Sequence, residues 1–442
     1  MNRLLWTLGL GVFAGALDLS VLSPALPALG RTFGVQTGDL AWVFTLYLLV
    51  TVLSIAVASA LADRYGRRPI YLLCIICFAA GSVVAIAAPS YPVFLAARTL
   101  QALGAGGIFP VATATIGDVV PAARRGAALG LVAATWGLAA VIGPSLGGLI
   151  THYVSWRYIF AANLPLAAIV FWLALDVVPA HAPRRREGLD TVGLTLLCGG
   201  LLALVDGLIE SRVATGVIGA GALIWFAMWE RTARNPLVPM DMLRTPQLAK
   251  TYALEIVIGA LEGSLFFIPA VLVAAQGMSA AAAGFVAALG ALTFVIVIPL
   301  SGRALDRIGS RDVLLMGTIV SEIGLGLFAL GFSSLPLSVL AIVIAGAGFG
   351  ALLGAPTRYI VTNETPAPVR ATAVGLLSQA LIVGQILGSS LAGGLMSAAH
   401  SELRGYRHAY LAFCALAFVG LIVASTLKPR ASERTRPLQE AA

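Results

Sequence analysis

Fourteen long apolar segments follow one another along this chain of 442 residues. Their lengths are close to the about 20 residues that an α-helix needs to cross a lipid bilayer. They cover 4–29, 40–61, 70–88, 92–115, 126–150, 157–178, 190–210, 213–230, 248–274, 281–301, 312–333, 336–359, 370–399 and 408–428. Hydrophobic residues make up 59% of the chain and charged residues only 11%, whereas soluble domains carry about 25% charged residues. The sequence therefore predicts an all-α membrane protein surrounded by a lipid bilayer.

The basic residues are distributed unevenly between the loops. If the N-terminus lies inside, 22 of the 28 Lys and Arg residues fall in cytoplasmic segments and 5 fall outside, while Arg98 lies within a span. Cytoplasmic loops of membrane proteins are enriched in Lys and Arg. We therefore expect both termini in the cytoplasm and an even number of spans. Because the basic residues alternate with apolar segments, we expect no nucleic-acid partner despite the net charge of +8.

Short motifs recur at nearly one spacing along the chain. Asp63-Arg64-Tyr65-Gly66-Arg67-Arg68 returns 243 residues later as Asp306-Arg307-Ile308-Gly309-Ser310-Arg311. Arg125…Gly130 returns as Arg370…Gly375, and the segment 143–148 returns loosely as 388–393, both after 245 residues. Both copies of the first motif fall on the cytoplasmic side, which is typical of repeats related by an axis along the membrane normal.

The repeats predict how the chain is divided. We expect an N-terminal six-helix bundle over 1–179 and a C-terminal six-helix bundle over 248–429. Segments 190–210 and 213–230 have no partner in this scheme, so residues 180–247 are predicted to form an inserted helix pair with cytoplasmic linkers. Residues 430–442 are predicted to form a cytoplasmic tail.

Charged residues inside the predicted spans are candidates for function. A charge at the centre of a spanning helix costs on the order of 2.5 to 3.5 kcal/mol on insertion scales. Asp18 could relay protons or contact a cationic substrate; alternatively, it is a buried carboxyl hydrogen-bonded to a neighbouring helix. Arg98 is always charged, so it must face a wet cavity or a carboxylate. The alternative to a functional role is a structural ion pair with Asp18 or another carboxylate.

Three further carboxylates lie in predicted spans of the second half. Glu255 and Glu262 are seven residues apart, which places them on one face of a helix about 10 Å apart. They are candidates for a proton or cation path, although Glu255 could instead reach toward the cytoplasmic interface. Glu322 could be a third site or a structural partner.

Several motifs carry a family resemblance. They are Leu17-Asp18…Leu26-Pro27, Asp63-Arg64-Tyr65-Gly66-Arg67-Arg68, Arg98-Thr99-Leu100-Gln101-Ala102-Leu103-Gly104, Gly137…Gly143-Pro144-Ser145-Leu146-Gly147-Gly148 and Trp156-Arg157-Tyr158…Asn163-Leu164-Pro165. Together they resemble the major facilitator superfamily, specifically its drug:proton antiporters of the fourteen-helix type, over nearly the whole chain. The sequence departs from that family at Ser59 and Ala102, where Gly is usual.

The resemblance implies a major facilitator fold with two six-helix bundles and two inserted transmembrane helices. It implies a secondary transporter, not an enzyme, that exports small amphipathic or cationic compounds in exchange for protons by alternating access. The proton gradient is then the energy source, and we expect no cofactor and no metal. We expect a monomer in a bacterial cytoplasmic membrane. The alternatives are a proton-coupled exporter of a metabolite, such as a sugar, amino acid or siderophore, and a non-transporting membrane sensor.

The resemblance also implies roles for individual residues. Arg98 is implied in proton coupling, with Gln101 as its polar neighbour. A conformational latch on the cytoplasmic side is expected from Asp63, Arg64, Gly66, Arg67 and Arg68, with a second copy at Asp306 and Arg307. A seal that favours export is implied for Gly137, Gly143, Pro144, Gly147 and Gly148. The simpler alternatives are topology-setting charge for the first motif and ordinary helix packing for the second.

Overall fold

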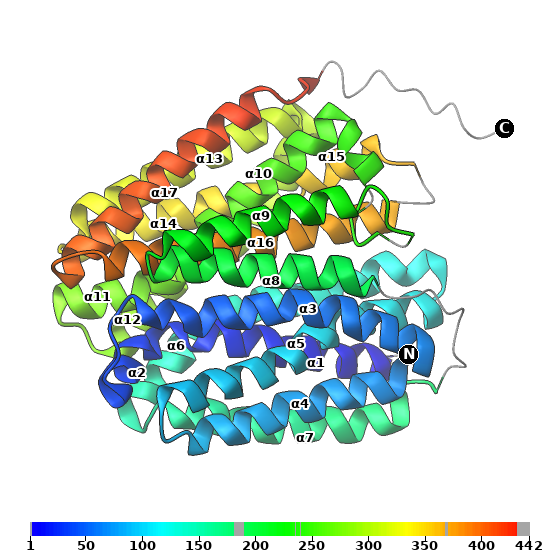
Figure 1. The fold of residues 1–442 in the computed structure, drawn as a ribbon, viewed down its shortest axis with the longest axis horizontal. Helices are drawn as coiled ribbons and strands as arrows, with labels where there is room; N and C mark the ends of the chain where they lie inside the picture. The colour runs from blue at the N-terminus through cyan, green and yellow to red at the C-terminus, as the bar shows by residue number, and fades with distance from the viewer. Residues whose placement is uncertain (1, 181–189, 235, 239, 367–369, 431–442) are drawn as a thin grey trace. The chain divides into compact units, whose positions relative to one another are not determined.

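The computed structural model describes residues 2–180, 190–234, 236–238, 240–366 and 370–430, without the side chains of 122–127, 129, 130, 133, 240, 241 and 371. Within these ranges the regular secondary structure is helical and contains no strand (Figure 1). Thirteen helical stretches in this described part are long and apolar enough to cross a membrane, and Val213–Trp229 is a shorter apolar helix. Each of the fourteen predicted segments coincides with one of these stretches, which confirms the predicted all-α membrane fold.

One compact unit contains Met1–Leu237 together with Phe266–Ala288. Within it α1 packs on α6 and α7, and α5 packs on α3 and α4. Its helices are α1 (Asn2–Val21), α2 (Leu26–Phe33), α3 (Trp42–Tyr65), α4 (Arg67–Ala87), α5 (Tyr91–Val119), α6 (Ala122–Tyr153), α7 (Arg157–Val177), α8 (Thr191–Ile209), α9 (Val213–Trp229) and α11 (Ile268–Gln276).

A second compact unit contains Val238–Leu265 and Leu289–Ala442. Within it α10 packs on α16 and α17, and α13 packs on α14 and α17. Its helices are α10 (Pro246–Gly263), most of α12 (Ala280–Ile308), α13 (Ser310–Gly331), α14 (Leu335–Leu352), α15 (Pro356–Glu364), α16 (Arg370–Ser397) and α17 (Glu402–Ser425). The domain division predicted from the repeats stays a prediction. Residues 181–189 of the predicted linker and 431–442 of the predicted tail lie outside the described residues.

The backbone repeats as the sequence motifs do. Gly34 ends α2 with φ 65°, and Gly277, 243 residues later, ends α11 with φ 64°. Gly66 follows α3 with φ 99°, and Gly309, again 243 residues later, follows α12 with φ 92°. Only glycine adopts such left-handed backbone conformations at little cost, so these positions fix how the helices end.

The first helix of each half is interrupted in the same way. A short 3-10 segment, Ser23–Ala25, separates α1 from α2, and another, Ser264–Phe267, separates α10 from α11. A proline at the start of the following helix accompanies each break, and proline cannot donate the backbone hydrogen bond that would continue the preceding helix. The two breaks therefore have one physical cause.

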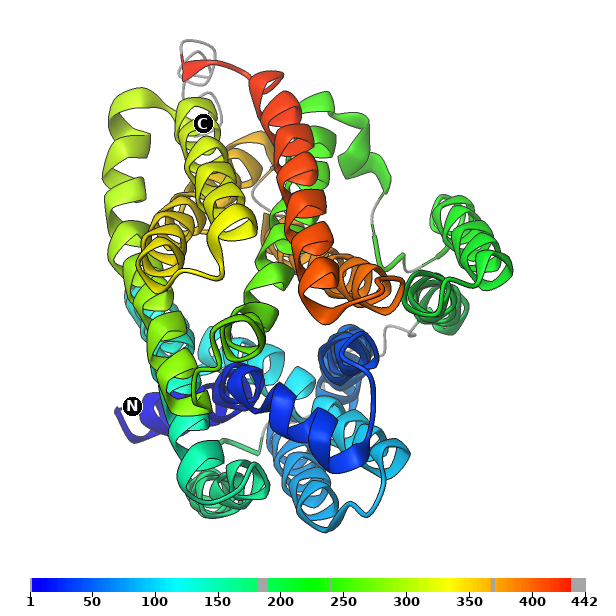
Figure 2. The same cartoon turned by 90° about the vertical axis from the view of Figure 1, so that its left-hand side faces the viewer.

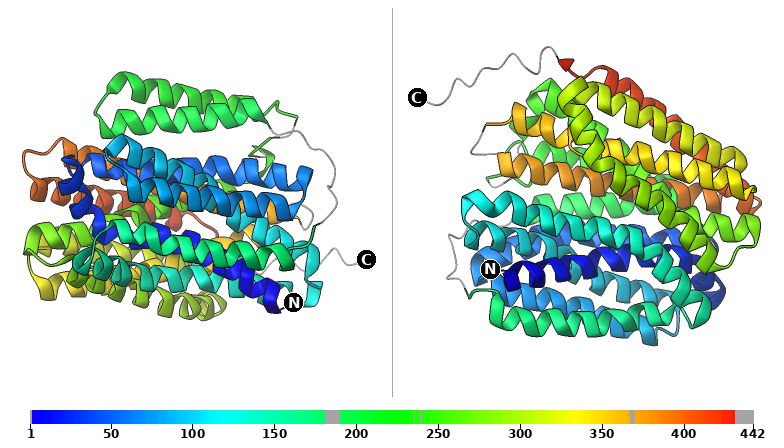
Figure 3. Two further views of the ribbon diagram at one scale, coloured as in Figure 1. Left: turned by 90° about the horizontal axis from the view of Figure 1, so that it is seen from below. Right: turned by 180° about the vertical axis from the view of Figure 1, so that it is seen from behind.

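The inserted helices α8 and α9 form a pair at the edge of the first unit, where α8 packs on α3 (Figure 2). The left view of Figure 3 shows the two green helices lying along each other over most of their length. The side chain of Asp190 accepts hydrogen bonds from the backbone N–H of Gly193, at 2.9 Å, and from Nε1 of Trp229, also at 2.9 Å. Asp190 therefore caps the start of α8 and joins it to the end of α9.

Candidate functional site

A fully buried ion pair lies in the first unit. The Nη1 atom of Arg98, on α5, is 2.5 Å from Oδ2 of Asp18, on α1, and both side chains are 0% exposed. The same Nη1 atom donates a hydrogen bond to Oε1 of Gln101 at 2.8 Å. Arg98 and Gln101 are three residues apart on α5, so they share one face of that helix. The guanidinium is thus shared between a carboxylate and an amide.

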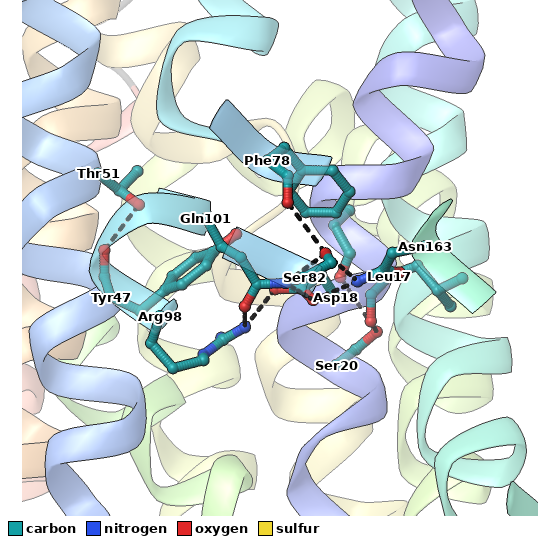
Figure 4. A network of polar contacts seen from close by, with 11 residues as sticks. Leu17, Asp18, Ser20, Tyr47, Thr51, Phe78, Ser82, Arg98, Gln101 and Asn163 are labelled. Carbon is teal, nitrogen blue, oxygen red and sulfur yellow. Dashed lines mark hydrogen bonds and ion pairs between the residues drawn. The ribbon is translucent and has the colours of Figure 1, made fainter. Parts of the chain in front are cut away.

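Two further polar side chains complete a network around Asp18 (Figure 4). The Oδ1 atom of Asp18 accepts hydrogen bonds from Nδ2 of Asn163, at 2.7 Å, and from Nε2 of Gln101, at 3.2 Å. Gln101 also donates to the hydroxyl of Ser82 at 2.8 Å, and that hydroxyl donates to the Phe78 carbonyl. Four helices, α1, α4, α5 and α7, therefore contribute to one buried polar cluster.

Aromatic rings enclose the cation. The guanidinium carbon of Arg98 lies 4.2 Å from the ring centroid of Tyr47, on α3, and 5.9 Å from that of Phe160, on α7. Such distances are typical of cation–π contacts. Among the described residues, the Nε and Nη2 atoms of Arg98 and the Tyr47 hydroxyl have no hydrogen-bond partner.

The network brings together three residues singled out from the sequence, Asp18, Arg98 and Gln101. The ion pair between Arg98 and Asp18 is the structural alternative considered for both residues, and it is compatible with a role in coupling. Sequence reasoning missed Ser82 and Tyr47, and it noted Asn163 only as part of a motif. The amide of Asn163 inside an apolar span could have indicated a place in a polar network, because polar side chains at membrane depth must find partners.

Glu255 and Glu262 lie on α10 of the second unit. The Oε2 atom of Glu262 accepts a hydrogen bond from Nε2 of Gln385, on α16, at 2.8 Å. Glu255 is 5% exposed and lies near Thr357 and Arg358 of α15. Its Oε2 atom has no hydrogen-bond partner among the described residues. Gln385 was not anticipated from the sequence.

Glu322 lies apart from these two carboxylates. It is partly buried on α13, near Cys414 of α17. No contact among the described residues joins it to Glu255 or Glu262. The structure therefore brings two of the three predicted carboxylates of the second half onto one helix and leaves the third on another.

The first copy of the turn motif contains an ion-pair network. Arg67, at the start of α4, lies 2.6 Å from Oδ1 of Asp63 at the end of α3, and 3.2 Å from Oδ2 of Asp118 at the end of α5. Gly66 supplies the left-handed turn between α3 and α4. Arg64 lies over the ring of its neighbour Tyr65, and Arg68 has no ion pair among the described residues. Arg67 thus connects the ends of three helices.

The second copy is built differently. Ser310 stands where the first copy has Arg67, and the side chains of Asp306 and Arg307 are exposed. Arg430, which follows α17, donates a hydrogen bond from Nη2 to the Asp306 carbonyl at 2.7 Å. A side chain at Gly309 would collide with Arg430.

Residues 426–430, here called the C-terminal strap, also contact other helix ends of the second unit. The Lys428 ammonium lies 2.6 Å from the Glu364 carboxylate of α15, and the Lys428 backbone N–H donates to Oε1 of Gln247 on α10. Lys250 of α10 donates to the Thr426 carbonyl at 3.0 Å. The strap therefore connects α10, α12 and α15, as Arg67 connects helix ends in the first unit.

The glycines of α6 lie where other backbones approach closely. A Cβ atom at Gly143 would collide with Ser20 of α1, whose hydroxyl donates to the Ala139 carbonyl at 2.9 Å. A Cβ atom at Gly147 would collide with the Val21 carbonyl, and one at Gly148 with the Ala280 carbonyl. Pro144 presents its carbonyl to Gly284 of α12, and Gly137 lies partly buried on the same helix. Close packing is therefore observed, and the role of a seal stays a prediction.

Long apolar helices, paired repeats and charges buried at membrane depth together define a multi-pass membrane transporter. The sequence model of the Major Facilitator Superfamily matches residues 8–261 and 251–442, and the chain belongs to this family.

Three curated relatives are similar to the chain over most of its length. It is 32% identical to the uncharacterized MFS-type transporter YfiU of Bacillus subtilis, over 90% of this chain and 81% of that protein. It is 31% identical to the multidrug resistance protein Stp of Mycobacterium tuberculosis, over 88% and 75%. It is 30% identical to the tetracenomycin C resistance and export protein of Streptomyces glaucescens, over 89% and 75%.

A solved structure supports the fold. The transporter PepTSo, of the POT family, superposes with a TM-score of 0.73 at 15% identity, over 96% of this chain and 97% of that one. The predicted major facilitator fold is thus confirmed, and the chain is a transporter of small-molecule substrates rather than an enzyme.

Proposed function

We propose that this transporter exports small amphipathic or cationic compounds, drugs among them, in exchange for protons by alternating access. The observation that carries the proposal is the buried pair of Asp18 and Arg98 inside a membrane-spanning bundle. Ionisable residues at membrane depth are costly and mark ion and substrate pathways. A carboxylate paired with a permanent cation can exchange that cation for a proton, which links protonation to a change in helix packing.

The relatives support export of toxic compounds. Two of them carry names that state multidrug resistance and tetracenomycin C resistance and export. All three come from bacteria, which supports a place in a bacterial cytoplasmic membrane. The distribution of Lys and Arg supports both termini on the cytoplasmic side.

The proposed cycle uses one carboxylate from each unit. A proton from outside neutralises Asp18, Arg98 loses its counter-ion, and the network around them rearranges. Glu262, held by the neutral amide of Gln385, supplies a second place for a proton or for a cationic substrate. Deprotonation on the inside restores the pair and readies the site for new cargo. The cycle needs no cofactor beyond the proton gradient, and one chain suffices for it.

The test is substrate-driven proton flux in proteoliposomes that contain a pH-sensitive dye. A panel of lipophilic cations and aromatic antibiotics should drive proton movement that depends on the protein, whereas sugars and amino acids should not. Flux with a metabolite alone would favour the metabolite exporter. Absence of flux with either panel, in liposomes where the protein is shown to be folded, would contradict proton-coupled transport and favour a sensor.

A further inference from the structure

The ring of Tyr47 is the closest aromatic neighbour of the buried cation. It projects from α3, whereas the described hydrogen bonds of the Asp18 network come from α1, α4, α5 and α7, and it lies 4.2 Å from the Arg98 guanidinium carbon (Figure 4). Tyr47 is 3% exposed, and its hydroxyl has no hydrogen-bond partner among the described residues. The phenol oxygen therefore does not explain why this large polar side chain is buried here, whereas the face of its ring does.

The hydrogen bonds of Arg98 are concentrated on one nitrogen. Nη1 contacts both Asp18 and Gln101, whereas Nε and Nη2 have no hydrogen-bond partner among the described residues. If Asp18 becomes neutral, the anion that compensates Arg98 is lost. The amide oxygen of Gln101 and the electron-rich face of Tyr47 are then the nearest groups that attract a cation.

We propose that Tyr47 is a positioning residue for proton coupling, whose ring holds Arg98 in place while Asp18 carries the proton. The inference rests on the proposed function and adds a residue and a physical interaction to it. The ring stabilises the protonated state relative to the ion-paired state, because a cation without a counter-ion gains most from an aromatic face. Tyr47 thereby sets how acidic the outside must be before coupling proceeds.

Few other ionisable groups surround the pair. The helices packed around it contribute the neutral side chains of Ser82, from α4, and Asn163, from α7. The α6 helix, which packs on α1, has no ionisable residue in the sequence between Arg125 and His152. Tyr71 and Cys74 of α4 face Gly11 of α1 and Gly107 of α5, about two to three helical turns from Ser82. Among the described residues, the ionisable groups at the level of the network are therefore Asp18, Arg98 and Tyr47 itself.

The unpartnered hydroxyl provides a matched control. Tyr47→Phe keeps the ring and removes only an oxygen without a hydrogen bond, so its profile of transport against outside pH should equal that of the wild type. Tyr47→Leu removes the ring and should move the midpoint of that profile to lower pH. We expect a shift of about 0.3 to 1.5 pH units, which corresponds to the roughly 2- to 30-fold effect of cation–π contacts.

The experiment measures proton flux driven by a fluorescent lipophilic cation, in proteoliposomes at a series of outside pH values. Because Tyr47→Leu could impair folding, a second series replaces Tyr47 with phenylalanines carrying one, two and three fluorines. These rings keep their shape and lose attraction for a cation stepwise, so a graded acid shift is expected. An unchanged midpoint across the series, or a Tyr47→Phe shift as large as that of Tyr47→Leu, would overturn the inference. If the wild type itself shows no coupled flux, the proposed function fails and this inference fails with it.

Discussion

The two units place carboxylates on corresponding helices, Asp18 fully buried and Glu262 partly buried, but surround them with different chemistry. Asp18 on α1 and Glu262 on α10 lie within one residue of the 243-residue spacing. Asp18 has a permanent cation and two amides as partners, whereas the described hydrogen bond of Glu262 comes from the neutral amide of Gln385. The charge of Asp18 is therefore balanced by a cation, whereas the charge of Glu262 is stabilised by the dipole of a neutral amide.

The difference matters because a fully buried ion pair and a partly buried single carboxylate respond oppositely to loss of charge. Neutralising one member of a buried pair leaves the other charge uncompensated. Neutralising a carboxylate that faces only an amide removes a charge that was costly to bury. The same chemical change should therefore destabilise the first unit and leave the second unit nearly unaffected, while both changes impair coupling. The following variants test this contrast, from the largest expected effect on stability to the smallest.

Asp18→Asn should have the largest effect. The uncompensated Arg98 cation is expected to cost about 3 to 5 kcal/mol of unfolding free energy and to abolish proton-driven efflux. Thermal unfolding in detergent and efflux from vesicles measure the two effects separately. Adding Arg98→Gln should recover much of the stability without restoring transport. If Asp18→Asn alone were as stable as the wild type, Arg98 would not depend on Asp18 to balance its charge.

Gly147→Ala and Gly388→Ala test packing rather than charge. Here we expect a similar loss of unfolding free energy in the two units. A Cβ atom at Gly147 would collide with the Val21 carbonyl of α1, and one at Gly388 would collide with the Ala260 carbonyl of α10. Each substitution should cost about 1 to 3 kcal/mol, the range for overpacking a close contact. Gly375→Ala is the control, because no heavy atom lies within 4 Å of the added Cβ. A large cost at only one of the first two glycines would mean that the units differ in packing as well as in charge.

Arg67→Ala and Arg430→Ala compare the two turn motifs. Arg67 is mostly buried and contacts two carboxylates, so its loss should cost about 1 kcal/mol. Arg430 donates to a backbone carbonyl near the surface and should cost less, about 0.5 kcal/mol. A double-mutant cycle between Arg67 and Asp118 should show coupling that falls as salt is added. Equal costs for the two arginines would show that the C-terminal strap is as strong a connection as the ion pair.

Glu262→Gln should have the smallest effect on stability. Its amide can still accept a hydrogen bond from Gln385, so the unfolding free energy should change by less than about 0.5 kcal/mol. Proton-driven efflux should nevertheless be lost, whereas the protein should still bind a neutral substrate. Unchanged efflux in both Glu262→Gln and Asp18→Asn would remove the assignment of proton antiport.

The spans could be predicted because bilayer thickness dictates length and hydropathy, two properties that each segment carries by itself. The pairing of Asp18 with Arg98 was foreseeable as an alternative, since a buried cation needs an anion. The contributions of Ser82, Asn163 and Tyr47 were not, because they depend on which faces α3, α4 and α7 turn toward α1. The strap was missed for a similar reason: its contacts join residues that lie far apart in sequence, from 64 positions for Lys428 and Glu364 to 181 positions for Lys428 and Gln247.

The four glycines with left-handed backbones, Gly34, Gly66, Gly277 and Gly309, indicate how the two halves of the chain arose. They occur as two pairs at one spacing, while the side chains around them have diverged: Arg67 corresponds to Ser310, and the Arg98 cation has no basic counterpart near 341–343. Duplication and fusion of an ancestral six-helix unit account for both facts. The side chains then came to differ between the two copies, whereas the glycines at which the backbone turns occupy the same positions in both.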